Sequence, residues 1–226
     1  MDLQKRTPYA YFDLLMAAFV AILLISNLAS TKIVSIWKFD FDGGTILFPL
    51  SYIFGDILTE VYGYRRSRRV IWMGFISAFL MALVLWIVQE LPTAQGWEYQ
   101  SDYQHILGFI PRIVVGSLIA FWTGEFTNSF IMSKLKILTK GRFLWVRTIG
   151  STLAGEGVDT AIFCLIAFYG ALPNSLLISI IVSNYIFKCG AEIIMTPVTY
   201  KVVYWLKKHE REDVYDYGIS YNPFRW

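Results

Sequence analysis

The sequence predicts an all-α integral membrane protein, a bundle of six transmembrane helices with both termini in the cytoplasm. The 226-residue chain is 56% hydrophobic and only 16% charged, whereas a soluble domain carries about 25% charged residues. The hydrophobic residues gather in long runs, and a helix needs ~20 mostly apolar residues to cross a bilayer. Basic residues fall in alternate loops between these runs, which is the pattern of a multi-pass protein.

Six apolar segments follow one another in a single domain, residues 1–226. They cover residues 14–31, 46–62, 70–88, 110–132, 148–169 and 176–206. The second segment is the shortest and most polar, and the third is the most apolar. Pro49 and Pro111 stand at predicted helix starts, where the missing N–H is not needed. Pro197 lies inside the sixth segment and is expected to bend it.

The distribution of charge orients these segments. Basic residues cluster after the second, fourth and sixth segments, in residues 65–69, 134–147 and 207–211. No Lys or Arg occurs from residue 70 to residue 111, which contain acidic residues instead. Because Lys and Arg favour the cytoplasmic side, both termini are expected there, in the cytoplasmic membrane. This arrangement needs an even number of spans, so the weak second segment is retained.

Carboxylates inside the predicted spans are the candidate functional residues, because a charged side chain at the bilayer centre costs ~2.5–3.5 kcal/mol. Glu156 and Asp159 are three positions apart in the fifth span and share one helix face. We expect Asp56, Asp159 and Lys188 to point into one interior cavity. The candidate ligand-binding residues are Asp159, Glu156, Asp56, Lys188, Glu192, Glu125, Asn184 and Asn27.

Structural roles compete with ligand binding for several of these charges. Glu60 lies four residues after Asp56 on the same helix face, and it can form a salt bridge to the arginine cluster at 65–69. Lys188 and Glu192 are also four apart and can pair with each other, or Lys188 can bridge to Asp159. A buried ion pair stabilises less than apolar packing, so its presence favours a polar cavity.

The buried set holds five or six carboxylates and one lysine, so it suits a cation or a ligand rich in N–H donors. Glu125 can alternatively hold the bundle together through a helix–helix hydrogen bond. Enzyme, cofactor and metal sites are not expected: the only histidines are His105 and His209, and no metalloprotease, nucleophile-elbow or P-loop motif occurs. Cys164 and Cys189 fall within spans and indicate neither a disulfide framework nor a zinc site.

Several motifs point to a known family. They are Ser26-Asn27, Phe48-Pro49, the run from Asp56 to Gly63 that leads into the arginine cluster, residues 151–160, and Tyr185-Ile186-Phe187-Lys188 followed by Pro197. This set resembles the VUT family, which contains the queuosine precursor transporters. The resemblance covers nearly the whole chain, residues 14–208.

The resemblance implies a bundle similar to the substrate-binding subunits of energy-coupling-factor transporters, and import of a 7-deazaguanine used in tRNA modification: preQ1, preQ0 or queuine. A carboxylate can accept the N1–H and exocyclic amine of a deazaguanine together. Asp159 is the expected acceptor, with Glu156 as second choice, and Lys188 or Asn184 is the donor to O6.

Two other functions stay open. One is a substrate-binding subunit of an ATP-driven vitamin-type transporter, a class that often has an Ala-x-x-x-Ala face such as Ala17 and Ala21. The other is a cation- or proton-coupled carrier, since intramembrane acids also serve proton relays. The expected partners are the small-molecule substrate, the lipid bilayer, and either further copies of the chain or energy-coupling subunits, with no nucleic acid.

Overall fold

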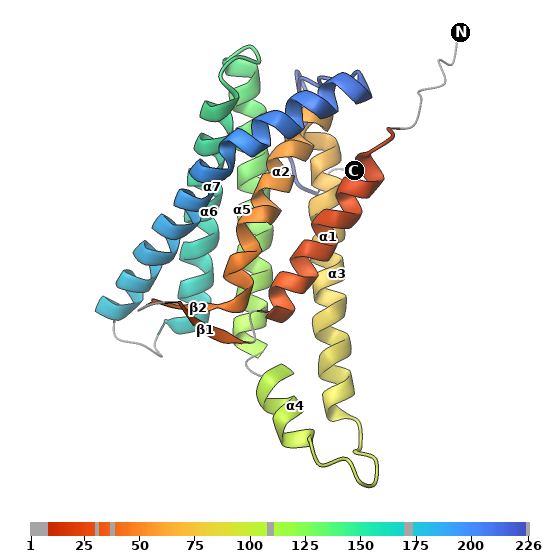
Figure 1. Cartoon of the computed structure of the whole chain (residues 1–226), viewed down its shortest axis with the longest axis vertical. Helices are drawn as coiled ribbons and strands as arrows, with labels where there is room; N and C mark the ends of the chain where they lie inside the picture. Colours follow the sequence, from red (N-terminus) through yellow and green to blue (C-terminus); the bar gives the residue numbers. More distant parts are fainter. Residues whose placement is uncertain (1–8, 30–31, 37–38, 108–110, 170–173, 225–226) are drawn as a thin grey trace.

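The computed structural model describes residues 9–29, 32–36, 39–107, 111–169 and 174–224. Long helices run alongside one another in an elongated bundle, and a short helix lies beyond one end of it (Figure 1). The helices are α1 (Phe12–Ala29), α2 (Phe48–Tyr62), α3 (Tyr64–Glu90), α4 (Gln100–Leu107), α5 (Pro111–Leu138), α6 (Leu144–Phe168) and α7 (Asn174–Glu210). Each predicted apolar segment coincides with one helix of the bundle, and the connection between α3 and α5 contains the additional helix α4.

The helical prediction is confirmed for every apolar segment, but the first connection is not helical throughout. Strands β1 (Ile33–Ile36) and β2 (Phe39–Asp42) pair antiparallel, with Ile33 opposite Asp42, and the short 3-10 helix η1 (Gly43–Ile46) follows. Ser26 of α1 donates a 3.0 Å hydrogen bond to the Gly44 carbonyl oxygen and so ties this connection to the bundle. The all-α prediction therefore omits one small hairpin.

Helix α2 occupies the centre of the bundle and contacts α1, α3, α5, α6 and α7. Its residues 51–53 and 55–62 are all buried. Fifteen residues span ~22 Å at ~1.5 Å per residue, less than the ~30 Å hydrocarbon core. Because other helices surround α2, it does not need an apolar surface, which explains why the second segment is the most polar.

The closest helix pair is α5 and α6, where glycines let the two backbones approach. A Cβ atom on Gly124 would lie 3.1 Å from the Gly155 carbonyl oxygen, and one on Gly155 would lie 3.0 Å from that of Gly124. Tyr52 of α2 packs against both positions. Small residues at such crossings allow close van der Waals packing between helices. This contact fixes α6, and with it Glu156 and Asp159, against α5.

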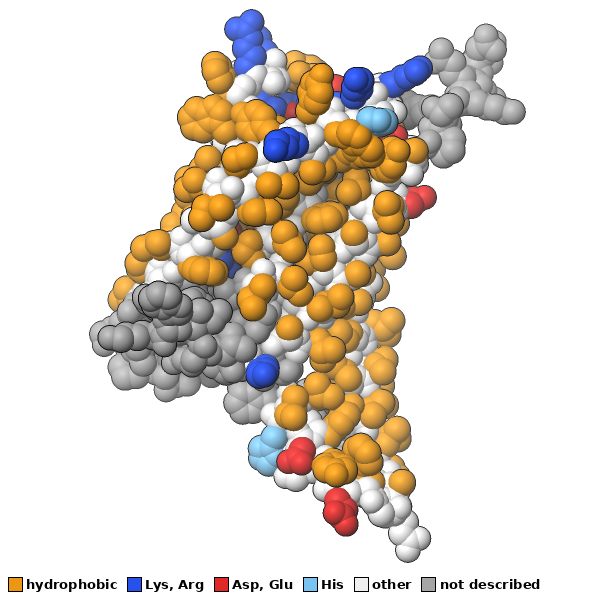
Figure 2. Space-filling model, in the orientation of Figure 1, with side chains coloured by type: hydrophobic (Ala, Val, Ile, Leu, Met, Phe, Trp, Pro, Cys, Tyr) orange, Lys and Arg blue, Asp and Glu red, His pale blue; other side chains and the backbone are white. Residues whose placement is uncertain are grey.

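The outer surface has the character of a membrane protein. Hydrophobic side chains cover the flank of the molecule, and Lys and Arg side chains gather at one end (Figure 2). Among the residues that the structure describes, three helical stretches are long and apolar enough to cross a membrane: Phe12–Ala29, Tyr64–Glu90 and Leu144–Ile166. Large hydrophobic side chains such as Leu80, Trp86 and Ile194 are at least half exposed, and in a membrane they would contact lipid.

Candidate functional site

Five buried carboxylates from four helices come together in the interior of the bundle. Asp56 is on α2, Glu125 on α5, Glu156 and Asp159 on α6, and Glu192 on α7, and each is at most 3% exposed. Glu125 lies close enough to the other four for electrostatic interaction with each. We call these five side chains the central acid set.

Lys188 of α7 neutralises part of the central acid set. Its ammonium nitrogen lies 2.6 Å from Asp159 Oδ2 and 2.9 Å from Glu156 Oε2. The predicted bridge from Lys188 to Asp159 is therefore confirmed, and the alternative pairing with Glu192 is wrong. Helix geometry allows the Glu192 pairing, but the two carboxylates on α6 face Lys188 from across the helix interface and bind it together.

Asp56 is held by neutral donors. Asn128 Nδ2 of α5 donates to Asp56 Oδ1 at 2.8 Å, and Ser151 Oγ of α6 donates to the same oxygen at 3.4 Å. The second oxygen, Oδ2, has no hydrogen-bond partner among the described residues. Asp56 therefore links α2, α5 and α6 and still offers one acceptor atom.

Glu125 and Glu192 are the members of the central acid set with no hydrogen-bond donor in the described part of the chain. All four of their carboxylate oxygens are buried and unpartnered. Glu125 lies against α2, where a Cβ atom on Gly55 would come 2.6 Å from Oε2. The glycine thus makes room for this carboxylate. The predicted alternative role of Glu125 in a helix–helix hydrogen bond finds no partner among these residues.

The two predicted asparagines differ in position. Asn27 donates to the Leu23 carbonyl oxygen at 2.8 Å and accepts from Ser117 of α5 at 3.3 Å. It therefore links α1 to α5, and these two bonds do not involve the central acid set. Asn184 is half-buried on α7, one helical turn before Lys188, on the face that carries the lysine.

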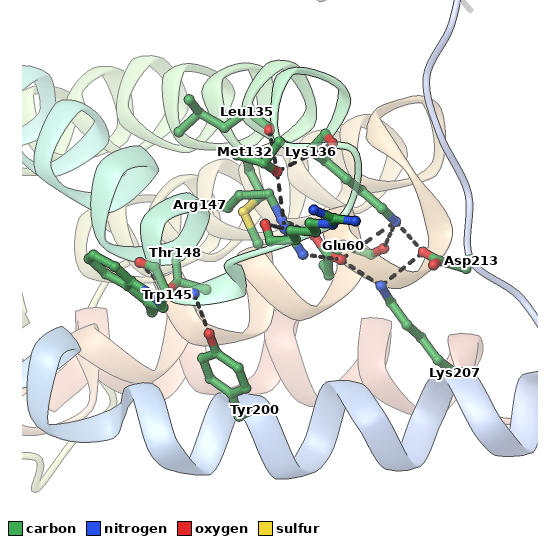
Figure 3. A network of polar contacts seen from close by, with 12 residues as sticks. Glu60, Met132, Leu135, Lys136, Trp145, Arg147, Thr148, Tyr200, Lys207 and Asp213 are labelled. Atoms are coloured by element: carbon green, nitrogen blue, oxygen red, sulfur yellow. Dashed lines mark hydrogen bonds and ion pairs between the residues drawn. The ribbon is translucent and has the colours of Figure 1, made fainter.

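Glu60 forms a second charged centre, at the end of the bundle where the basic side chains gather (Figure 3). Arg147 of α6 holds it with two bonds, Nε to Oε2 at 2.9 Å and Nη2 to Oε1 at 2.7 Å. Lys207 of α7 donates to Oε1 at 2.6 Å, and Lys136 of α5 lies 3.6 Å from the same oxygen. The four residues join α2, α5, α6 and α7.

The predicted salt bridge from Glu60 to the arginine cluster at 65–69 is therefore wrong. Gly63 ends α2 with φ 82°, and α3 begins in a new direction at the next residue. Arg66 turns back to the Tyr62 carbonyl oxygen, and Arg68 binds the carbonyl oxygens of Ser220 and Asn222. The partners of Glu60 are Lys136, Arg147 and Lys207, which lie far from it in the sequence. In the sequence they are recognisable only as basic residues that orient the spans.

The chemistry of the central acid set is that of hydrogen-bond acceptance. Five carboxylates face one ammonium group, so several buried oxygens need donors or positive charge. No three His, Cys, Asp or Glu side chains of the described residues are arranged to hold a metal ion. The arrangement suits a small ligand that carries N–H donors or a positive charge and that Lys188 can meet through a ligand oxygen.

Comparison with known proteins identifies the family. A family described as "Putative vitamin uptake transporter" matches residues 42–202. The chain belongs to this family. The matched region includes α2 to most of α7 and contains the whole central acid set, and membership makes the chain a membrane transporter and not an enzyme.

Curated relatives in the family carry more specific names. A "Probable queuosine precursor transporter" of Bacillus subtilis is 29% identical over 187 residues, 82% of each chain. The "Queuosine precursor transporter" of Escherichia coli is 27% identical over 136 residues, 60% of this chain and 59% of the relative. A "Probable queuosine precursor transporter" of Haemophilus influenzae is 26% identical over 126 residues, 56% of this chain and 51% of the relative. No solved structure matches the chain significantly.

Proposed function

We propose that this chain imports a queuosine precursor, a 7-deazaguanine such as preQ1, preQ0 or queuine, across the cytoplasmic membrane. The names of the three relatives support this substrate class. The observation that carries the proposal in this chain is the central acid set, a group of buried acceptors with one ammonium group among them. A 7-deazaguanine supplies the complementary groups: adjacent N–H donors, a ring carbonyl oxygen and, in preQ1, a cationic aminomethyl group.

Six helices cross the membrane in this proposal: α1, α2, α3, α5, α6 and α7. Helix α2 is short but is shielded from lipid by its neighbours, so its low hydropathy does not prevent it from being a span. The basic end, with the α5–α6 turn and the end of α7, faces the cytoplasm under the positive-inside rule. The even number of spans places both termini there and α4 outside.

Asp159 and Lys188 are the proposed ligand-binding pair. A carboxylate accepts the N1–H and exocyclic amine of a deazaguanine in a bidentate manner, and such charge-assisted bonds are the stronger kind. Lys188 lies 2.6 Å from Asp159 Oδ2, so an ammonium donor for O6 stands beside the carboxylate acceptor. The unpartnered oxygens of Glu125 and Glu192 are additional acceptors for a ligand cation.

Uptake of labelled preQ1 by a precursor-auxotrophic cell that expresses this chain tests the proposal. Asp159→Asn keeps the side-chain shape but turns one acceptor oxygen into a donor, and an unpaired donor costs ~1–3 kcal/mol. We expect the apparent affinity for preQ1 to fall ~10–100-fold while expression stays normal. The matched control is Glu98→Gln, because Glu98 is an exposed carboxylate in the α3–α4 connection.

A double-mutant comparison separates ligand binding by Asp159 from its contact with Lys188. If Asp159→Asn acts only by releasing Lys188, then Lys188→Gln alone reproduces the loss, and the double variant shows no further loss. If Asp159 binds the ligand, the double variant is weaker than either single variant. Normal preQ1 uptake by Asp159→Asn contradicts the assignment of Asp159, and no uptake by the unmodified chain contradicts the proposed function.

The energy source separates the remaining alternatives. Ala17 and Ala21 are both on the exposed face of α1, so they are accessible to a partner subunit of the energy-coupling-factor kind. We propose that the chain works without such a subunit. Purified chain in liposomes should then exchange labelled preQ1 without ATP. Exchange that requires a co-purifying ATPase supports the substrate-binding-subunit alternative, and ion flux without any nucleobase supports the cation carrier.

A further inference from the structure

The chain after α7 folds back over the basic end of the bundle as an irregular segment. Helix α7 ends at Glu210, and Arg211 turns the chain with φ 54°, a left-handed conformation that side chains other than glycine rarely adopt. Residues 212–224 contain no helix or strand. We call residues 211–224 the strap. The family match ends at residue 202, so the strap lies outside the matched region.

The first half of the strap clamps α5 to α7 through Asp213. Its Oδ1 atom lies 2.5 Å from the ammonium nitrogen of Lys136 on α5 and 2.8 Å from that of Lys207 on α7. Both lysines also reach Glu60, so Asp213 completes the charged centre described above (Figure 3). Asp213 itself is 43% exposed, whereas Glu60 is fully buried.

The middle of the strap clamps α3 to α5 through Asp216. Its buried Oδ2 atom accepts the backbone N–H of Tyr64, at the start of α3, at 2.8 Å. The same oxygen accepts a 2.5 Å hydrogen bond from Ser133 Oγ on α5. Gly63 provides the space, because a Cβ atom there would lie 2.7 Å from Val214 and 2.9 Å from Asp216.

The last part of the strap lies along α3. Arg68 donates to the Asn222 carbonyl oxygen at 2.6 Å, and Trp72 Nε1 donates to that of Pro223 at 2.8 Å. Tyr221 packs against Phe130 of α5 with ring centroids 4.9 Å apart. The strap is thus attached to α3, α5 and α7 along its whole length.

We propose that the strap is a latch for the cytoplasmic side of the transporter, and that it must release α5 from α3 and α7 before substrate leaves toward the cytoplasm. This inference rests on the proposed transport function. Alternating access moves groups of helices against one another around a fixed site, so at the inner end the helices must separate. Asp213 and Asp216 bridge the helices that would part, which makes them positioning residues of the cycle.

Three features make the strap suited to this role. Its release melts no helix, because residues 212–224 contain none. Asp213 already contacts solvent, so water replaces its lysine partners at small cost when it detaches. The left-handed Arg211 lies at the hinge between α7 and the strap, so a rotation there relieves an unfavourable backbone conformation.

A reversible cross-link tests whether release is required. In the variant S133C/D216C the two thiols replace side chains that are hydrogen-bonded to each other, and oxidation to a disulfide would tie the strap to α5 until a reductant is added. We expect the oxidised protein to lose most preQ1 uptake and a reductant to restore it, with S133C and D216C alone insensitive to oxidation. Uptake that is equal in the oxidised and reduced protein overturns the latch. The same protein is compared in two states, so altered folding does not explain a difference.

Accessibility of a buried residue gives a second measurement that needs no substrate. Ser129 is fully buried on α5, one turn deeper than Ser133. In inside-out vesicles, Ser129→Cys should react with an impermeant maleimide about tenfold faster when combined with Asp213→Asn. The substitution keeps the oxygen but removes the charge that attracts Lys136 and Lys207, and a weakening comparable to the loss of a charged hydrogen bond shifts the opening equilibrium by about that factor. Glu98→Gln should not change the rate.

The two measurements also separate failure of the latch from failure of the proposed function. If the unmodified chain takes up no preQ1, the proposed function fails, and maleimide labelling still decides whether the strap closes this end. If uptake is normal but Asp213→Asn leaves the labelling rate unchanged, the latch is wrong and the strap is a permanent staple.

Discussion

Replacing Glu60 with Gln should destabilise the whole protein. Glu60 belongs to the second charged centre and has no proposed role in ligand binding. The carboxylate accepts two bonds from Arg147 and one from Lys207, at 2.7–2.9 Å and 2.6 Å, and it is fully buried. The amide of Gln keeps one acceptor oxygen and turns its NH₂ group toward these cations. Removing one partner of a buried ion pair costs ~3–5 kcal/mol.

That cost is a large part of the ~5–15 kcal/mol that stabilises a folded domain. At ~2–4 °C per kcal/mol for a chain of this size, the melting temperature should fall by ~6–20 °C. The chain offers its own reporter, because Cys164 and Cys189 are free and buried. A thiol-reactive fluorescent dye therefore reads out unfolding of the purified protein in detergent.

The control for this measurement is Glu98→Gln, an exposed carboxylate whose replacement should leave the melting temperature unchanged. Combining Glu60→Gln with Arg147→Gln gives a double-mutant cycle. The loss from Arg147→Gln should be smaller in the Glu60→Gln background than alone, because the partner is already missing. A melting temperature for Glu60→Gln within 2 °C of the unmodified protein, roughly the effect of less than 1 kcal/mol, would refute the reasoning.

Three further outcomes are expected. Ser101→Cys on exposed α4 should react with an impermeant thiol reagent added to intact cells, and reaction only after lysis would contradict the six-span topology. Gly155→Leu should abolish folding, measured as monodisperse protein in detergent, because even a Cβ atom meets Asn128 at 2.9 Å. Partial burial raises the pKa of Asp213, but hydrogen bonds from Lys136 and Lys207 lower it more, so the pKa lies below its ordinary value. The stabilisation by Asp213 is then present above about pH 4 and disappears as the pH falls through the lowered pKa; Asp213→Asn should remove this acid-dependent part of the melting curve.

The sequence predicted the helices well because apolar runs of this length have few alternatives. The parity of basic loops correctly retained residues 46–62 as a helix, although their hydropathy is low. What the sequence could not show is why it is low: α2 is enclosed by five helices, and its polar residues face protein. A hydropathy profile measures how well a segment is suited to contact lipid. Most of α2 is buried against other helices, so this measure does not apply to it.

Pairing of charges was predicted less well than their burial. Rules for neighbours four apart on a helix favoured a Lys188–Glu192 pair, but Asp159 and Glu156 on α6 hold Lys188 instead. For Glu60 the neighbouring arginines were obvious in the sequence, yet the glycine break at residue 63 turns them away. Ion-pair partners on another helix depend on how the helices pack. That packing cannot be deduced from the spacing of residues in a single sequence. The strap was not predicted either, because a segment without helix or strand has no periodic pattern in the sequence.

The central position of α2 has a consequence for how the protein is made. Its helix is 15 residues long and contains both Asp56 and Glu60, so a ribosome-bound insertion machinery has little reason to release it into lipid by itself. The cations that neutralise Glu60 are synthesised 76, 87 and 147 residues later. Lys136 on α5 and Arg147 on α6 precede α7 in the chain, so two of the three cations can reach Glu60 before Lys207 of α7 is made. Lasting insertion of α2 is therefore expected to depend on synthesis of α5 and α6, and Lys207 completes the charged centre last.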